Sequence, residues 1–267
     1  MSVQPWAQWH AEHERRLADP HGFLAVTSLN FLTGTPRRFP DAPGEWSTGA
    51  DGVVVELGDG ESLTVGGVPV TGRHSFGVID ERGGVDAVAG DAVIEVAKRG
   101  GFDIVRPRHP ENPLRLAFHG TPAYEPDDRW VLTGRFVPFD APRDVTVGAA
   151  VEGLEHVYES PGRVEFEVDG TALALTVFNG RTPGSFFALF TDETSGVTTY
   201  PANRSVAIDP PAADGTVVLD FTRATNLPCA YTDFATCPLP PAENRLPVAV
   251  EAGEKIPYER LATVTRR

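Results

Sequence analysis

Short apolar runs, separated by glycine-containing turns about every 8–12 residues, are the feature that most constrains what this chain can fold into. Asp169-Gly170 lies between the alternating runs Val164–Val168 and Ala172–Val177, and this dipeptide is the strongest hairpin signal in the chain. Arg99-Gly100-Gly101 separates two further runs in the same way. Such spacing is typical of all-β sandwiches and barrels. The sequence therefore predicts a mainly β fold, an antiparallel sandwich or barrel.

The other candidate strands share this length and alternation. They are Val53–Leu57, Ser62–Val65, Ala92–Ala97, Phe102–Val105, Trp130–Val137, Ser185–Thr191, Arg204–Ile208 and Thr216–Phe221. One helix is expected, at Pro5–Leu17, because a proline precedes tryptophans at helical spacing. No linker or internal repeat divides the sequence. We therefore predict one domain over residues 1–267, with a helix at about 5–18, a β core at about 23–221 and a proline-rich functional loop at 220–255.

Composition narrows the classes of function. The 267 residues are 41% hydrophobic and 22% charged, as in soluble globular proteins with a sizeable core. The net charge of -14 argues against nucleic acid, whose phosphates require clustered Lys and Arg, and against anionic lipid surfaces. The N-terminal stretch lacks the apolar segment of a signal peptide, and no apolar run has the length of a membrane span. We therefore expect a cytoplasmic protein with no membrane partner. The sequence leaves its oligomeric state open.

The segment Asp220–Lys255 is too polar and too rich in proline for an ordinary helix or strand. It contains both cysteines and five of the 24 prolines. Its apolar residues, among them Phe221, Tyr231 and Leu246, are anchors that a disordered segment would lack. Long irregular segments inside compact domains are usually functional. We therefore interpret it as an ordered, functional loop.

This segment carries a family resemblance. The runs D-F-T-R-A-T-N-L-P-C-A (220–230), C-P-L-P-P (237–241), N-R-L (244–246) and A-G-E-K (252–255) resemble the signature of the DUF1684 family of bacterial and archaeal proteins of unknown function. Thr222 stands where the family usually has Asn, and Leu227 where it has Pro. Upstream, F-T-D-E-T-S-G (190–196), with Thr199, Tyr200 and Arg204, resembles a second family block. The resemblance implies a family but no reaction.

Cys229 and Cys237 are eight residues apart, which is not the C-x-x-C spacing of zinc or thioredoxin-like sites. Three interpretations remain: buried structural thiols, a close pair that can oxidise or bind a soft metal, or a single nucleophile. The last needs a base such as His109 or His119 nearby in space. We expect both thiols to be reduced in the cell. We expect no bound metal, and no cofactor is predicted.

Polar residues at strand ends and in the loop indicate two functional hypotheses. The first is an enzyme acting on a small polar or anionic metabolite, with acid–base chemistry from Asp192, Asp220 or Glu254. In the second, a non-catalytic ligand-binding or scaffold module, the same charges only pin the loop. The residues expected to bind substrate are Thr194, Tyr200, Arg204, Arg223, Asn226, Asn244, Arg245 and Lys255. A hydrolase lacks its usual support, because no G-x-S-x-G motif is present.

The charges of the 192–204 block and of the 220–255 loop predict where the two segments lie. Neither segment contains enough opposite charge to satisfy itself, and an unpaired buried charge costs several kcal/mol. We therefore expect the two segments to meet around one polar pocket. Arg204 and Arg223 are the expected bridges to carboxylates such as Asp192 and Asp220.

Overall fold

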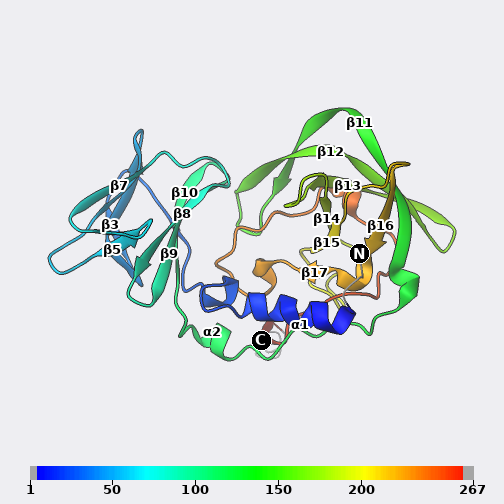
Figure 1. Cartoon of the computed structure of the whole chain (residues 1–267), viewed down its shortest axis with the longest axis horizontal. Coiled ribbons are helices and arrows are strands. Elements are labelled where there is room, and N and C mark those ends of the chain that lie inside the picture. The colour runs from blue at the N-terminus through cyan, green and yellow to red at the C-terminus, as the bar shows by residue number, and fades with distance from the viewer. Residues whose placement is uncertain (1–4, 261–267) are drawn as a thin grey trace. The chain divides into compact units, whose positions relative to one another are not determined.

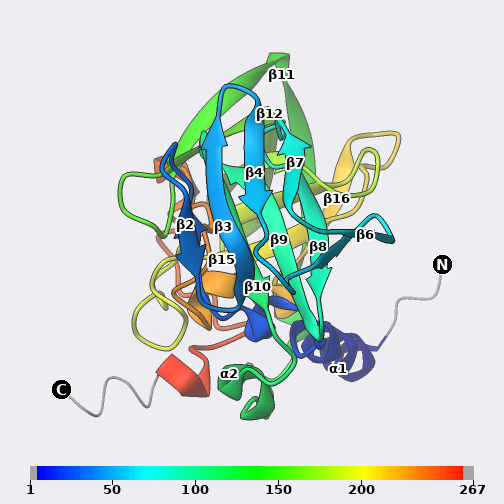
Figure 2. The ribbon, with the colours of Figure 1, turned by 90° about the vertical axis from the view of Figure 1, so that its left-hand side faces the viewer.

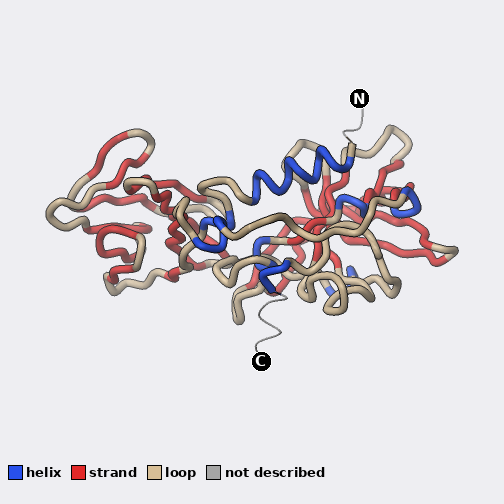
Figure 3. Tube along the Cα trace, turned by 90° about the horizontal axis from the view of Figure 1, so that it is seen from below, coloured by secondary structure: helices blue, strands red, loops and turns tan. Residues whose placement is uncertain are grey.

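The computed structural model describes residues 5–260, and strands account for most of its regular secondary structure (Figure 3). All pairs between the named strands are antiparallel. The longest helix among the described residues, α1, runs over Trp6–Leu17. The predicted mainly β, antiparallel fold with an N-terminal helix is thus confirmed. Within the described residues, no helix is both long enough and apolar enough to cross a bilayer.

The chain divides into two compact units. The first unit comprises the residues up to Glu12 and from Gly120 onward, and the second comprises His13–His119. Helix α1 begins in the first unit and ends in the second. Compactness alone does not tell whether a unit folds independently. The expectation of a single domain therefore stays a prediction.

Two sheets form the second unit. One has the order β1-β10-β9-β8-β5-β6 and the other β2-β3-β4-β7, and Figure 2 shows the latter strands side by side. Trp46 and Val55 from the smaller sheet and Ile94 and Val105 from the larger one share a single buried core, so this unit is a sandwich. The elements are η1 Phe23–Ala25, β1 Asn30–Phe31, β2 Arg37–Phe39, β3 Ala42–Gly49, β4 Gly52–Glu56, β5 Leu63–Val65, β6 Val68–Val70, β7 Arg73–Gly77, β8 Gly84–Ala89, β9 Ala92–Arg99, β10 Phe102–Arg108 and α2 Pro113–Leu116.

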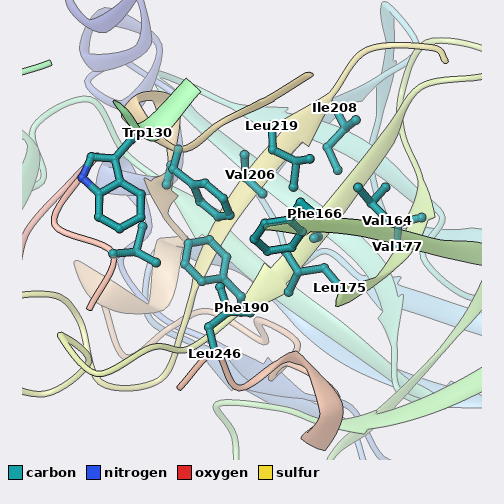
Figure 4. Close-up of a cluster of buried hydrophobic side chains, with 14 of the residues drawn as sticks. Trp130, Val164, Phe166, Leu175, Val177, Phe190, Val206, Ile208, Leu219 and Leu246 are labelled. Atoms are coloured by element: carbon teal, nitrogen blue, oxygen red, sulfur yellow. The ribbon is translucent and has the colours of Figure 1, made fainter. Parts of the chain in front are cut away.

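One seven-stranded sheet, in the order β16-β11-β12-β13-β14-β15-β17, forms the first unit. The sheet curls on itself, so that β15 lies against β16 (Figure 1). Its concave side holds an aromatic-rich core that includes Trp130, Phe166 and Phe190 (Figure 4). The elements are η2 Asp128–Trp130, β11 Val131–Gly148, β12 Glu155–Val168, β13 Thr171–Asn179, β14 Phe186–Phe190, β15 Arg204–Ile208, β16 Thr216–Asp220, η3 Phe221–Arg223, β17 Thr225–Asn226, η4 Pro228–Ala230 and η5 Ala242–Asn244.

The turn chemistry of the sequence is visible in the backbone. Asp169 and Gly170 join β12 to β13 with φ of 49° and 81°, as a two-residue type I′ turn requires. The predicted hairpin is therefore confirmed. Strand β3 was not predicted, because Pro43 and Gly44 interrupt its alternation. It pairs with β4 all the same, since Trp46 anchors it in the core with no exposed surface.

Helix α1 packs through its tryptophans on the polar loop of the first unit. The Trp6 indole donates a hydrogen bond to the carbonyl of Thr222 at 2.7 Å, and the Arg223 guanidinium lies 5.3 Å from the centre of the Trp9 ring. His10 stacks on Trp6 at 4.7 Å. The tryptophans therefore dock the helix on the loop, and this brings His10 among the loop residues.

Candidate functional site

The Asp220–Lys255 segment is ordered and is built from short 3₁₀ turns rather than long elements. Helices η3, η4 and η5 and the two-residue strand β17 are its regular parts. Prolines begin or precede two of these turns, where their fixed φ suits the first helical position. Specific side-chain hydrogen bonds hold the segment in place, as its sequence predicts.

Asp192 and Arg204 form a fully buried ion pair. Arg204 Nη2 donates to Asp192 Oδ2 at 2.7 Å, and the side chains are 1% and 0% exposed. Asp192 Oδ1 also accepts hydrogen bonds from the backbone N–H and the hydroxyl of Thr194. Because these additional hydrogen bonds satisfy the buried carboxylate, the pair can hold the two segments together.

Arg204 extends this pair to the proline-rich loop. Its guanidinium donates to the carbonyls of Val250, at 3.0 Å, and Ala252. Burial lowers the pKa of Arg204, against the opposing charge of Asp192. The two segments therefore meet, as the sequence predicts, through an arginine whose donors are directed at the loop backbone. Because these bonds use Nη1 and Nη2, they leave little of this guanidinium for a ligand. A polar pocket between the two segments stays a prediction.

Asp220 and Arg223 pair within a single 3₁₀ turn of the loop, rather than across the two segments as the sequence analysis expects of Arg223. Asp220 Oδ1 accepts from the N–H of Thr222 at 3.1 Å and so caps helix η3. Asp220 Oδ2 lies 3.1 Å from Arg223 Nε, and the two side chains are 25% and 24% exposed. This pair is local and partly solvated, unlike the buried pair of Arg204.

Glu254, the third candidate catalytic carboxylate, is also enclosed, with 1% of its surface exposed. Its Oε2 accepts from the N–H of Asn226 at 2.6 Å and lies 3.4 Å from the Tyr231 hydroxyl. Its Oε1 is 3.5 Å from His10 Nε2. Burial, and then the charge of Glu254, raises the pKa of Tyr231 well above its ordinary value. Helix α1, strand β17 and the loop thus converge on one carboxylate.

Asn244 and Arg245 are neighbours with opposite environments. Asn244 is completely buried, and its side-chain amide bridges the backbones of β13 and β14. It accepts a hydrogen bond from the N–H of Thr176 and donates to the carbonyls of Thr176 and Leu189, each at 2.8 Å. Arg245 follows with an exposed side chain. The buried anchor therefore fixes the backbone from which Arg245 projects.

The remaining predicted binding residues also make internal contacts. The hydroxyls of Thr194 and Thr199 are 2.8 Å apart. Tyr200 donates its hydroxyl to the carbonyl of Cys229 at 2.8 Å, and burial raises its pKa to about 12. The Asn226 amide donates to the carbonyl of Lys255 at 2.8 Å, and the Lys255 ammonium lies 4.2 Å from the centre of the Tyr124 ring. These contacts order the loop.

The two cysteines are buried and adjacent. The N–H of Cys229 donates to Cys237 Sγ at 3.2 Å, and the apolar contacts of the pair include Ala235 and Leu227. Among residues 5–260, no group of three His, Cys, Asp or Glu side chains is placed to hold a metal ion. His109 and His119, the proposed bases, belong to the second unit.

A cleft of about 470 Å³ opens where β11, β12 and β13 meet the loop. Arg143 from β11, Arg163 from β12 and Arg245 from the loop line it, and Glu243 is the carboxylate among its lining residues. Thr176 donates its hydroxyl to Glu243 at 3.1 Å. Of these residues, only Arg245 is predicted from the sequence to bind substrate.

A profile described as "Protein of unknown function (DUF1684)" matches residues 116–255, just over half of the 267. The chain belongs to the DUF1684 family. A search of curated proteins returns no match. Among solved structures, the chain is similar to the solution NMR structure of an uncharacterised protein from Haloarcula marismortui, with 29% identity over 53% of this chain and 78% of that chain and a TM-score of 0.45.

In this DUF1684 protein the signature residues have two kinds of environment. Most are enclosed anchors, such as Asp192, Arg204 and Asn244, while Arg245 faces solvent. The sequence does not single out Arg143 and Arg163 as binding residues, because they lie on exposed strand positions, where arginine is common. What could have identified them is the strand pairing. Strand β11 pairs with β12 and β12 with β13, and this brings Arg143 and Arg163 beside the N-R-L motif.

Proposed function

We propose that this DUF1684 protein is a binding module for a small anionic ligand, held in the cleft between Arg143, Arg163 and Arg245, and that its charged loop is the rigid support of that site. The observation that carries the proposal is that three arginines, from two strands and the loop, line one cleft. Guanidinium groups bind carboxylate and phosphate groups through paired hydrogen bonds.

Arg245 is the best placed of the three for a ligand. It stands between Asn244 and Leu246, which are 0% and 2% exposed, so its backbone is anchored on both sides. Within residues 5–260 its guanidinium makes no hydrogen bond, ion pair or ring contact. Because the backbone of Arg245 is already fixed, only its side chain has to be ordered when an anion binds.

The other two arginines are partly engaged and more exposed. Arg163 donates to Glu165 Oε1 from Nε and Nη2, at 2.9 and 2.6 Å. The Arg143 guanidinium lies 3.8 Å from the centre of the Phe139 ring. Glu165 and Glu243 offset part of the positive charge. This balance favours a ligand with one or two negative charges over a polyanion.

Binding is favoured over acid–base catalysis because the three candidate carboxylates have structural partners. Asp192 is paired with Arg204, Asp220 caps η3 and pairs with Arg223, and Glu254 accepts from a backbone N–H. None of the three lines this cleft. The cytoplasmic location and the exclusion of nucleic acid stay predictions.

The test is calorimetric titration of the full chain with inorganic phosphate, succinate and a neutral sugar as separate probes. We expect an anion to bind, the sugar not to bind, and Arg245→Ala to weaken anion binding at least tenfold with an unchanged melting temperature. Arg135→Ala is the matched control, because Arg135 lies on the same strand as Arg143 but outside the cleft. Equal binding by Arg245→Ala and wild type, or no binding of either anion, would overturn the proposal.

A further inference from the structure

Cys229 and Cys237 contact each other in an enclosed part of the loop. The N–H of Cys229 donates to Cys237 Sγ at 3.2 Å. The side chains belong to a small cluster that Tyr200 and Leu227 cover in part. Because Cys237 Sγ already lies against Cys229, a bond between the two sulfurs requires little rearrangement of the backbone.

The surroundings distinguish the two thiols. The hydrogen bond from Cys237 lowers the pKa of the Cys229 thiol; burial opposes this, while the Cys229 backbone N–H, the charge of Arg260 and the Tyr200 hydroxyl add to it. Arg260 reaches this place by donating to the carbonyl of Cys229 at 3.0 Å. Thiolate character is what makes a cysteine react with peroxides, and a neighbouring thiol is what resolves the product.

We propose that the two cysteines form a peroxide-reactive pair, in which Cys229 is the attacking thiol and Cys237 is the resolving thiol. In the first step the Cys229 thiolate attacks one oxygen of hydrogen peroxide. An S–O bond forms, the O–O bond breaks, and the leaving hydroxide takes up a proton to become water. In the second step Cys237 attacks the sulfenic sulfur of Cys229. An S–S bond forms, the S–O bond breaks, and a second water leaves with the thiol proton.

Burial limits which oxidants can reach the pair. Cys229 and Cys237 are 4% and 7% exposed, which admits small molecules such as hydrogen peroxide but not a peptide disulfide. The site therefore takes hydrogen peroxide and excludes glutathione disulfide. Reduction by dithiothreitol, another small molecule, returns the pair to its thiol form.

Mass spectrometry of the native full-length protein tests the proposal, because one tryptic peptide, residues 224–245, contains both cysteines. After hydrogen peroxide we expect this peptide to lose the mass of two hydrogen atoms and to regain it with dithiothreitol. Glutathione disulfide should leave the mass unchanged. This measurement needs no variant. An unchanged peptide after peroxide, or a glutathione adduct on the native protein, would overturn the proposal.

Two serine variants test the assignment of roles. In the presence of dimedone, Cys237→Ser should stop at the sulfenic acid of Cys229 and form at least ten times more adduct than Cys229→Ser. Circular dichroism melting curves check that both variants are folded. Equal trapping in the two variants, or more in Cys229→Ser, contradicts the assignment. If either variant does not fold, the rate of iodoacetamide labelling of each cysteine in the wild type decides it, with Cys229 expected to react first.

Discussion

Arg204 donates to Asp192 across 2.7 Å while both side chains are sealed from solvent, and the same guanidinium reaches the carbonyls of Val250 and Ala252. One arginine on β15 therefore joins the turn after β14 to the last part of the proline-rich loop. Removing one partner of a buried pair leaves the other charge uncompensated, which is more costly than losing the pair itself.

Arg204→Ala should therefore destabilise the protein by about 3–5 kcal/mol. Arg223→Ala is the matched control: its ion pair with Asp220 is one quarter exposed and joins residues of the same turn, so we expect a loss of about 1 kcal/mol or less. Urea denaturation of the two variants measures the difference. Similar losses in both would contradict the assignment of Arg204 as the pin.

Asn244→Ala should cost about 3 kcal/mol, because it leaves the buried N–H and C=O of Thr176 and the C=O of Leu189 without their partner. Arg245→Ala, one residue along, should change stability by less than about 0.5 kcal/mol, since its side chain is exposed and unpaired within the described residues. Thermal melts of the two variants test the contrast. A stable Asn244→Ala variant would show that the amide is dispensable.

Gly253→Ala should be strongly destabilising, because a Cβ there would lie 2.4 Å from the carbonyl oxygen of Ala224 and the backbone φ is +71°. Gly170→Ala separates the two effects: φ is +81°, but nothing lies within 4 Å of the added carbon. We expect about 1–2 kcal/mol for Gly170→Ala from backbone strain alone, and a clearly larger loss for Gly253→Ala. Chemical denaturation measures both. Equal losses would mean that the loop can move aside.

The ion pairs of Glu95 should make the stability of the second unit fall at acidic pH. Glu95 pairs with Arg99 at 2.8 Å, with Arg106 at 2.7 Å and with Arg108. Burial acts to raise the pKa of Glu95, but Arg106 and Arg108 outweigh it and hold the pKa below its ordinary value of 4.5. A lowered folded-state pKa means that the ionised form is stabilised by folding.

This contribution is therefore present above pH 4.5 and is lost as the pH falls through the lower folded-state pKa. We expect Glu95→Gln to be less stable than wild type at pH 7, with the difference shrinking steadily below pH 4.5. Urea midpoints between pH 7 and pH 3 provide the measurement. A difference that is independent of pH would contradict the prediction.

Much of the fold was predictable from local sequence. Turns such as Asp169-Gly170 restrict the backbone to conformations that few residues adopt, and alternating runs show which face of a strand is buried. The predicted strands of the first unit are present, and the D-F-T-R-A and A-G-E-K runs correctly indicated an ordered segment. Strands such as β3 were missed because their place depends on a partner strand rather than on their own pattern.

By itself, therefore, the sequence determined the β class, the main hairpins, the helix at the N-terminus and the need for Asp192 and Arg204 to find partners. Only the tertiary structure decided that Arg204 is enclosed while Arg245 faces a cleft, and that Cys229 touches Cys237. The physical reason is that turn chemistry and alternation act over a few residues. Burial and charge pairing depend on which distant segments meet, and no local pattern contains that information.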